Sequence, residues 1–156
     1  MSVLVSGGAG FIGSHRARAL IAKGERVRVL DALIPQVRLG KGVVQELPSV
    51  TEFMPGNVSD QMAWQRAWEG IDVAFHPAAE VGVGQSMYEI SRYIQANVLG
   101  TATLLALLAT GQYPLNKLIV ASSMAIYGEG TYACDSWSQA YPALRGIEQL
   151  QGDGGI

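Results

Sequence analysis

A glycine-rich turn between an apolar run and a helical pattern constrains this chain more than any other feature. The run Val3–Val5 predicts a buried β-strand, and glycines follow at positions 7, 10 and 13. The pattern after this turn predicts a helix over Phe11–Lys23. Gly7 would let the backbone turn sharply, Gly10 would let an anion approach it, and Gly13 would let the helix pack against the strand. Unpaired N–H groups at the start of a helix bind anions. The stretch predicts a dinucleotide-binding unit, with a glycine-rich turn of some other α/β unit as the alternative.

An acidic residue downstream supports the same interpretation. Asp31 closes the apolar run Arg26–Leu30 and lies 18 residues beyond Gly13, where a carboxylate can hydrogen-bond a ribose 2′-hydroxyl. The same carboxylate would repel a 2′-phosphate, and the next residue, Ala32, offers no cation. The sequence therefore favours NAD over NADP, and a solvated aspartate at a strand end is the alternative.

Composition limits the class of protein. The chain has 156 residues, 49% of them hydrophobic and 15% charged, which is typical of one globular domain with a packed core. A net charge of −2 without a basic run argues against nucleic acid and anionic membranes as partners. One cysteine, Cys134, excludes an internal disulfide and fits a reducing cytosol. No signal peptide is evident and the longest apolar stretch, 98–109, is too short to span a bilayer, so we expect a cytoplasmic protein.

Strand and helix patterns alternate through most of the chain. Three further strands are predicted over Val50–Met54, Ile71–His76 and Lys117–Ser122. A short helix is predicted over Gln61–Glu69, and the capping-box spacing of Ser86 and Glu89 predicts a long helix that runs to about Thr110. This alternation predicts a Rossmann-like, doubly wound parallel sheet of about five strands in the order 3-2-1-4-5. We expect the dinucleotide-binding domain to cover 1–130 and an irregular tail to cover 131–156.

Several conspicuous side chains are assigned to structure rather than to chemistry. Trp64 and Trp68 lie four residues apart on one helix face, which favours packing against the sheet over stacking on a base. His15 on the first helix and His76 at a strand end are also predicted to be structural. On the first helix, the positions predicted to face the sheet are Ile12, Ala19, Leu20 and Ala22.

Four sequence motifs together resemble a known family. They are Gly7-Gly8-Ala9-Gly10-Phe11-Ile12-Gly13, His76-Pro77-Ala78-Ala79, Asn97-Val98-Leu99-Gly100-Thr101 and Ser122-Ser123-Met124-Ala125-Ile126-Tyr127-Gly128. The chain resembles the extended short-chain dehydrogenase/reductases, and within them the NAD-dependent epimerase/dehydratase family that acts on nucleotide sugars. The segments 81–86 and 126–130 look most like those of sugar 4-epimerases. The resemblance covers about residues 2–132.

The resemblance implies a role for each matching residue. It assigns the pyrophosphate of NAD to Gly7, Gly10, Phe11, Ile12 and Gly13, the adenosine ribose to Asp31, and the nicotinamide side of the cleft to Ala78 and Ala79. It assigns the adenine amine to Asn57, where the family usually has an aspartate, with Val58 beside it among the cofactor-binding residues. Asn97 orders the site, and Ser123 hydrogen-bonds the reacting oxygen of the sugar. Two positions depart from the family: Pro77 replaces a leucine, and Glu80 replaces a glutamine and adds a carboxylate near the substrate mouth.

The catalytic pair of the family is missing where it should occur. That pair is a Tyr-x-x-x-Lys on the helix after the fifth strand, and all three lysines of this chain precede that place. Tyr141 and Arg145 have the spacing, but arginine does not replace a lysine of tuned pKa, and Pro142 opposes a helix. The resemblance thus predicts the NAD-binding portion of an epimerase or dehydratase, inactive alone and ending before the later strands and the substrate lobe. The alternatives are a self-standing, non-catalytic dinucleotide-binding module and an enzyme completed by a second chain.

The same features predict the partners. NAD and a nucleotide sugar are the small-molecule partners that the resemblance implies. The predicted strand Lys117–Ser122 would expose an apolar sheet edge, and leucines on more than one face of the long helix would add an apolar surface. We therefore expect a homodimer or a larger assembly.

Overall fold

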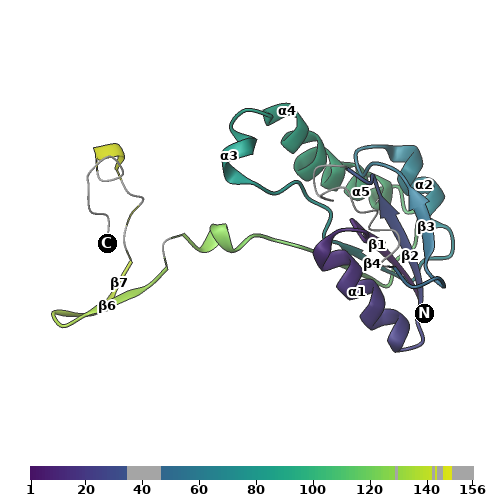
Figure 1. The fold of residues 1–156 in the computed structure, drawn as a ribbon, viewed down its shortest axis with the longest axis horizontal. Helices are drawn as coiled ribbons and strands as arrows, with labels where there is room; N and C mark the ends of the chain where they lie inside the picture. Colours follow the sequence, from purple (N-terminus) through teal and green to yellow (C-terminus); the bar gives the residue numbers. More distant parts are fainter. Residues whose placement is uncertain (35–46, 129, 142, 144–145, 149–156) are drawn as a thin grey trace. The chain divides into compact units, whose positions relative to one another are not determined.

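The chain folds around a parallel five-stranded sheet whose middle strand is the N-terminal one. The computed structural model describes residues 1–34, 47–128, 130–141, 143 and 146–148, and they form two compact units, Met1–Ala121 and Ser122–Ile156. In the first unit the strand order is β3-β2-β1-β4-β5, which confirms the predicted topology (Figure 1). The strands are β1 (Ser2–Ser6), β2 (Arg26–Asp31), β3 (Glu52–Pro55), β4 (Val73–His76) and β5 (Lys117–Val120).

The centre of strand β1 is apolar on both of its sides because both faces of the sheet are covered. Val3, Leu4 and Val5 are each at most 1% exposed, and β1 pairs in parallel with β2 on one side and β4 on the other. Val3 and Val5 pack in one core cluster and Leu4 in a second, on the opposite face. Alternation along the strand thus divides the core into two layers.

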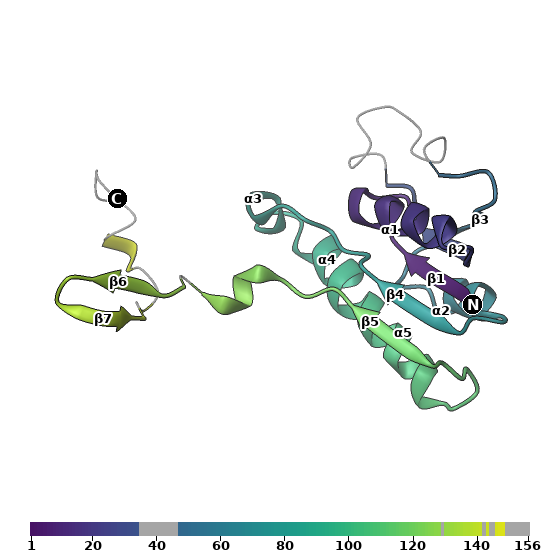
Figure 2. The same ribbon diagram turned by 90° about the horizontal axis from the view of Figure 1, so that it is seen from below.

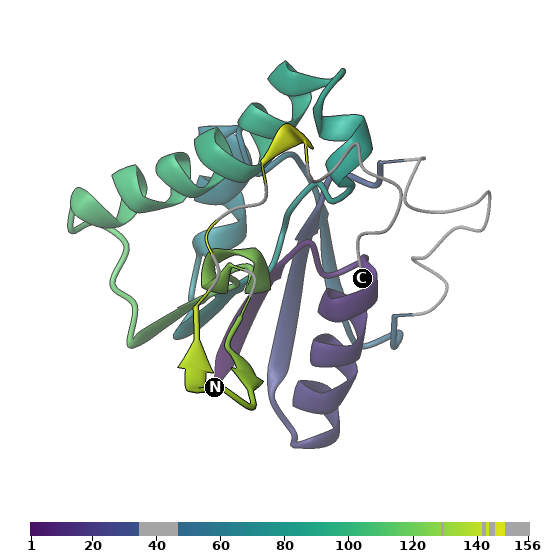
Figure 3. The ribbon, with the colours of Figure 1, turned by 90° about the vertical axis from the view of Figure 1, so that its left-hand side faces the viewer.

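Helices cover both faces of this sheet. Helix α1 (Phe11–Ala22) packs on one face, and α2 (Gln61–Trp68) and α5 (Gly100–Ala109) pack on the other (Figures 2 and 3). In α2 the Asp60 carboxylate accepts a hydrogen bond from the backbone N–H of Met62 at 2.8 Å and caps the helix. Trp64 and Trp68 are 1% and 3% exposed, which confirms their assignment to the core.

The side of α1 that faces the sheet differs from the predicted one at most positions. Its buried residues are Gly13, Ser14 and Ala17, with Leu20 and Ile21 packed beside them, whereas Ile12 is 68% exposed and Ala19 and Ala22 are also exposed. Small residues occupy the contact because the first turn of the helix lies directly against the glycine turn that follows β1. The prediction is correct for Leu20 and wrong for the other three positions.

The long helix predicted from Ser86 is interrupted. The structure has α3 (Val83–Ser86), α4 (Ile90–Tyr93), a π-helical segment η3 (Ile94–Leu99) and then α5. The capping box is not formed: the hydroxyl of Ser86 donates to the carbonyl of Val83, and the carboxylate of Glu89 binds Gln85 and Arg92. These side-chain partners compete with the cap, so the continuous helix begins at Ile90 and the prediction of Ser86 as its start is wrong.

The second unit contains the short helix η4 (Met124–Tyr127) and two antiparallel strands, β6 (Tyr132–Cys134) and β7 (Trp137–Ala140). The two units divide after Ala121, whereas the predicted boundary lies at 130. The sequence predicts an irregular tail over 131–156, and the structure has two paired strands in it. The sequence does not indicate these strands because its apolar alternation there is faint. Residues 149–156 lie outside the described part of the chain.

The described ranges show neither a membrane span nor a metal cluster. No helix there has both the length and the apolar character needed to cross a bilayer. Those ranges also hold no group of three or more histidine, cysteine or acidic side chains placed to bind a metal ion.

Candidate functional site

A cavity of about 810 Å³ opens at the carboxyl ends of β1, β2 and β4. The chain runs from β1 to β2 and β3 on one side, then returns to β4 and β5 on the other, so the cavity lies where the strand order reverses. Ligands of open parallel sheets bind at such a switch point. The predicted site residues that line the cavity are Gly7, Gly10, Phe11, Ile12, Gly13, Asp31, Asn57, Val58, Ala78 and Ala79.

Each of the three glycines has a separate steric reason to lack a side chain. Gly7 has φ of 62°, and a Cβ there would lie 2.8 Å from the Cα of Ala78. A Cβ on Gly13 would lie 2.1 Å from the carbonyl oxygen of Gly7, so helix and turn touch backbone to backbone. Among the described residues, a Cβ on Gly10 would meet only the same Gly7 oxygen, at 3.3 Å, and the space beyond belongs to the cavity. The turn therefore requires Gly7 and Gly13, whereas Gly10 keeps the cavity open.

The start of α1 offers hydrogen-bond donors to this cavity. Gly10 is the N-cap residue, and none of the described side chains caps the helix, whose first backbone hydrogen bond runs from Ser14 N–H to the Gly10 carbonyl at 2.9 Å. The preceding N–H groups at the positive end of the helix suit an anion. A pyrophosphate fits this arrangement.

Asp31 braces the glycine turn as well as bordering the cavity. One carboxylate oxygen accepts a hydrogen bond from the N–H of Ala9 at 3.0 Å, and the other accepts one from the N–H of Leu33 at 2.8 Å. A carboxylate offers about four lone-pair sites, so the same group can serve the backbone and ribose hydroxyls together. Sequence reasoning did not find this bracing role, because nothing in the spacing shows that Asp31 reaches back 22 residues to Ala9.

Asn57 and Val58 border the cavity beside the end of β3. The amide oxygen of Asn57 accepts hydrogen bonds from the N–H and the hydroxyl of Ser59, both at 3.0 Å. Both lone pairs of that oxygen are thereby used, so the adenine contact predicted for it requires the Ser59 hydroxyl to turn away. Val58 is 7% exposed, and its carbonyl accepts a hydrogen bond from the indole of Trp64.

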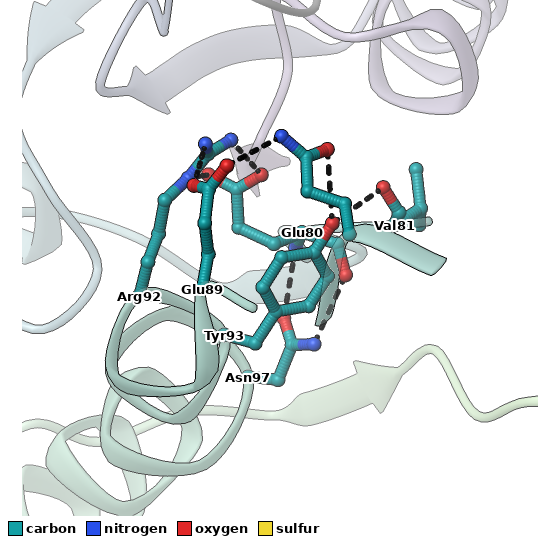
Figure 4. A network of polar contacts seen from close by, with 7 residues as sticks. Glu80, Val81, Glu89, Arg92, Tyr93 and Asn97 are labelled. Carbon is teal, nitrogen blue, oxygen red and sulfur yellow. Dashed lines mark hydrogen bonds and ion pairs between the residues drawn. The ribbon is translucent and has the colours of Figure 1, made fainter. Parts of the chain in front are cut away.

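Asn97 acts on the cavity through a neighbouring segment. It does not line the cavity; its amide nitrogen donates to the carbonyl of Glu80 at 3.0 Å, and its amide oxygen accepts from the N–H of Glu80 at 2.8 Å (Figure 4). Glu80 does line the cavity, but its side chain is buried and paired with Arg92. The carboxylate predicted near a substrate mouth is thus neutralised by a partner that the sequence did not reveal.

His76 is a buried structural residue, as predicted. Its Nδ1 lies 2.6 Å from the hydroxyl oxygen of Ser6 and its Nε2 lies 3.1 Å from that of Thr101. Because the Thr101 hydroxyl donates to the carbonyl of Asn97, it accepts from Nε2–H, and Ser6 donates to Nδ1. Burial lowers the pKa of His76 to about 4. His15 lies exposed on α1, in edge contact with Phe11 at 4.9 Å between ring centroids.

The depressed pKa of His76 predicts an acid limb in stability. His76 takes up a proton near pH 6.5 in the unfolded chain and near pH 4 in the folded chain. The contribution of neutral His76 to the free energy of unfolding is therefore fully present above pH 6.5 and is lost as the pH falls from 6.5 to 4. The loss should reach roughly 2–3 kcal/mol by pH 4. Urea unfolding across this pH range tests it, with His76→Gln as the variant that should lack this contribution. An identical pH dependence in both proteins would contradict it.

The predicted catalytic residue lies in the second unit. Ser123 is the N-cap of η4, where its hydroxyl accepts a hydrogen bond from the N–H of Ala125 at 3.2 Å. Its predicted contact with a reacting oxygen stays a prediction. Arg145, which has the catalytic spacing with Tyr141, lies outside the described residues.

A Tyr-x-x-x-Lys spacing that the sequence reasoning overlooked occurs at Tyr113 and Lys117. It spans the connection from α5 to β5 rather than a helix: Tyr113 packs edge-on against Trp68, and Lys117 begins β5 opposite Val73. Val73 is the first residue of β4, so Lys117 lies at the amino edge of the parallel sheet, away from the cavity at its carboxyl edge. This pair cannot serve the site.

The strand order, the glycine turn, the uncapped α1 and the acid at the end of β2 define a Rossmann-type dinucleotide-binding domain. The chain belongs to the NAD dependent epimerase/dehydratase family, whose sequence model matches residues 3–143. The family named from the motifs is thereby confirmed.

Similar proteins include several sugar 4-epimerases. A dTDP-L-rhamnose 4-epimerase of Burkholderia thailandensis is 34% identical over 96% of this chain and 42% of its own length. A UDP-glucose 4-epimerase of Halalkalibacterium halodurans is 37% identical over 83% of this chain and 36% of its own length. The solved structure of Thermus thermophilus UDP-glucose 4-epimerase in complex with NAD is 34% identical, with a TM-score of 0.70, over 90% of this chain and 44% of that one. The chain therefore spans about two fifths of the length of the relatives it matches.

Proposed function

We propose that this chain is the NAD-binding portion of a nucleotide-sugar epimerase or dehydratase. The observation that carries the proposal is the cavity at the switch point, bordered by the uncapped start of α1 at Gly10 and by the carboxylate of Asp31. Its volume of about 810 Å³ is within the range typical of ligand sites, about 300–1,000 Å³. The NAD complex of a 34% identical structure supports the choice of ligand.

The order of groups along the cavity supports one orientation of the cofactor. Asp31 would hold the adenosine ribose, the N–H groups of the first turn of α1 would hold the pyrophosphate, and the nicotinamide half would extend toward Ala78 and Ala79 at the end of β4. Asn57 and Val58 would border the adenine. When bound, NAD would supply a hydride acceptor and donor, and the residues described here would bind and orient it.

Cofactor choice provides the first test of this proposal. Asp31 should make the chain bind NAD at least about tenfold more tightly than NADP, because its charge opposes a 2′-phosphate. Asp31→Asn removes the charge and keeps one oxygen, which can still accept from one of the two backbone N–H groups, so it should bring the two affinities closer together. Calorimetric titration of both cofactors into both proteins measures this. If the unmodified chain binds NADP as tightly as NAD, the proposed role of Asp31 is wrong.

Nucleotide sugar is the proposed second ligand, on the basis of the epimerases to which the chain is similar. The self-standing module and the enzyme completed by a second chain remain the alternatives. A cytoplasmic location also stays a prediction from the sequence.

We further propose that the chain forms a dimer or a larger assembly. In the described part of the chain β5 has a strand neighbour only on the β4 side, and its residues Ile119 and Val120 are 37% and 44% exposed. Apolar side chains on η3 and α5 are also exposed, among them Val98 and Leu105 at 56% and 50%. Burying such surface against another chain is favourable. Light scattering at high concentration should report a species larger than the monomer, and a monodisperse monomer would contradict the proposal.

A further inference from the structure

A bidentate ion pair holds a segment that lines the cavity beyond the end of β4. Glu80 follows Ala78 and Ala79 in the connection from β4 to α3, and the residue is 6% exposed. Arg92 on α4 donates from Nε to one oxygen of its carboxylate at 3.1 Å and from Nη2 to the other at 2.7 Å (Figure 4). Two parallel bonds of this kind fix the relative orientation of the two groups as well as holding them together.

Arg92 also serves a second carboxylate. Its Nη1 donates to Glu89 at 2.6 Å, and Gln85 donates to the other oxygen of Glu89 at 2.7 Å. Hydrogen bonds from Gln85 and Arg92 hold the pKa of Glu89 below its usual value, and hydrogen bonding to Glu80 raises the pKa of Arg92. One guanidinium between two carboxylates does not make this end of the cavity attractive to a phosphate. A positioning role fits Arg92 better than an anion-binding role.

Contacts from the same helical segment converge on the residues next to Glu80. The Tyr93 hydroxyl donates to the carbonyl of Val81 at 3.1 Å, and a Cβ on Gly82 would lie 3.0 Å from that hydroxyl. Asn97 bonds both backbone groups of Glu80. Hydrogen bonds therefore join consecutive backbone groups of the connection to α4 and η3. The pair of Glu80 and Arg92 adds an ion pair to these contacts.

We propose that Arg92 and Glu80 are a positioning pair that holds the connection 78–82 in place for the nicotinamide half of the dinucleotide. This inference rests on the proposed function. A dinucleotide whose adenosine ribose lies at Asp31 extends across β1 toward the end of β4, and Ala78, Ala79, Glu80 and Arg92 line the cavity there. The adenosine half is bound by other elements, so the pair should affect one half of the ligand only.

The test compares NAD with ADP, which lacks the nicotinamide half. Glu80→Gln removes the negative charge of the pair, and Arg92→Lys removes its bidentate geometry, while both retain a polar side chain of similar length. Both variants should bind ADP as the unmodified chain does and bind NAD about 3- to 10-fold more weakly, the scale of a coupled contact network. Glu89→Gln is the matched control: it removes the charge of the second carboxylate that Arg92 binds and leaves the pair with Glu80 intact, so its NAD affinity should be unchanged.

A double variant separates positioning from stability. If the two residues act as a pair, Glu80→Gln combined with Arg92→Lys should weaken NAD binding no more than the stronger single change. A lowered melting temperature with an unchanged ratio of NAD to ADP affinity, in both single variants, would overturn the inference and show a purely structural pair. An unmodified, folded chain that bound neither NAD nor ADP would instead overturn the proposed function, and this inference with it.

Discussion

Replacing Gly13 with alanine is expected to lower the free energy of unfolding by about 3 kcal/mol or more, at the upper end of the range for overpacking. The added Cβ would lie 2.1 Å from the Gly7 carbonyl oxygen and 2.6 Å from the Gly8 Cα. These are backbone atoms of a turn that is itself fixed, because Gly7 N–H donates to the Leu30 carbonyl at 2.7 Å. Neither the helix nor the turn can move aside without disrupting the hydrogen bonds and packing that join α1, β1 and β2.

Urea unfolding followed by circular dichroism measures this loss. Gly84→Ala is the matched control, because Gly84 also lies in a helix and a Cβ there has no atom within 4 Å among the described residues. The control should change the stability by less than about 1 kcal/mol. Equal stabilities of the two variants would contradict the claim that α1 lies too close to the glycine turn to admit a side chain at position 13.

The second large effect concerns catalysis: the chain alone is expected not to turn over a nucleotide sugar. A general base must lie within reach of the sugar hydroxyl with its pKa near the working pH, and a tyrosine of ordinary pKa near 10 is protonated at neutral pH. The family's remedy, a lysine four residues after the tyrosine on the helix following β5, is missing from this sequence. Losing a general base lowers the rate by about 10²–10⁴-fold.

Incubation with NAD and a panel of nucleotide sugars tests this expectation. Neither an epimerised product nor the absorbance of reduced cofactor should form. Turnover that is lost in Ser123→Ala would show that the chain is an enzyme by itself, with a base not yet identified.

Much of the fold was predictable because local and long-range signals agree. The run Val3–Val5, the glycine turn and the acid at position 31 each require the same βα unit. Alternating strand and helix patterns then leave few topologies for a parallel sheet, since crossovers are right-handed. For the same reason the residues that line the cavity could be identified from their positions at the ends of strands.

The details that sequence reasoning missed depend on side chains finding partners across the fold. Glu89 matches a capping box by spacing, but Arg92 and Gln85 bind its carboxylate instead. Glu80 is isolated in the sequence, and only the return of α4 brings Arg92 to it. The exposure of Ile12 follows from the cavity beside the start of α1, which amphipathic periodicity cannot reveal.

Titration of NAD into the unmodified chain and into Gly10→Ala, side by side, tests the central claim most directly. In the part of the chain that the structure describes, a Cβ on Gly10 would meet only the Gly7 oxygen, at 3.3 Å, and a shift of a few tenths of an ångström relieves this contact, so the variant should fold. The same Cβ would occupy the place proposed for the pyrophosphate. We predict NAD binding by the unmodified chain and at least about tenfold weaker binding by the folded variant. No binding by the folded unmodified chain, or equal affinities in the two proteins, would contradict the account.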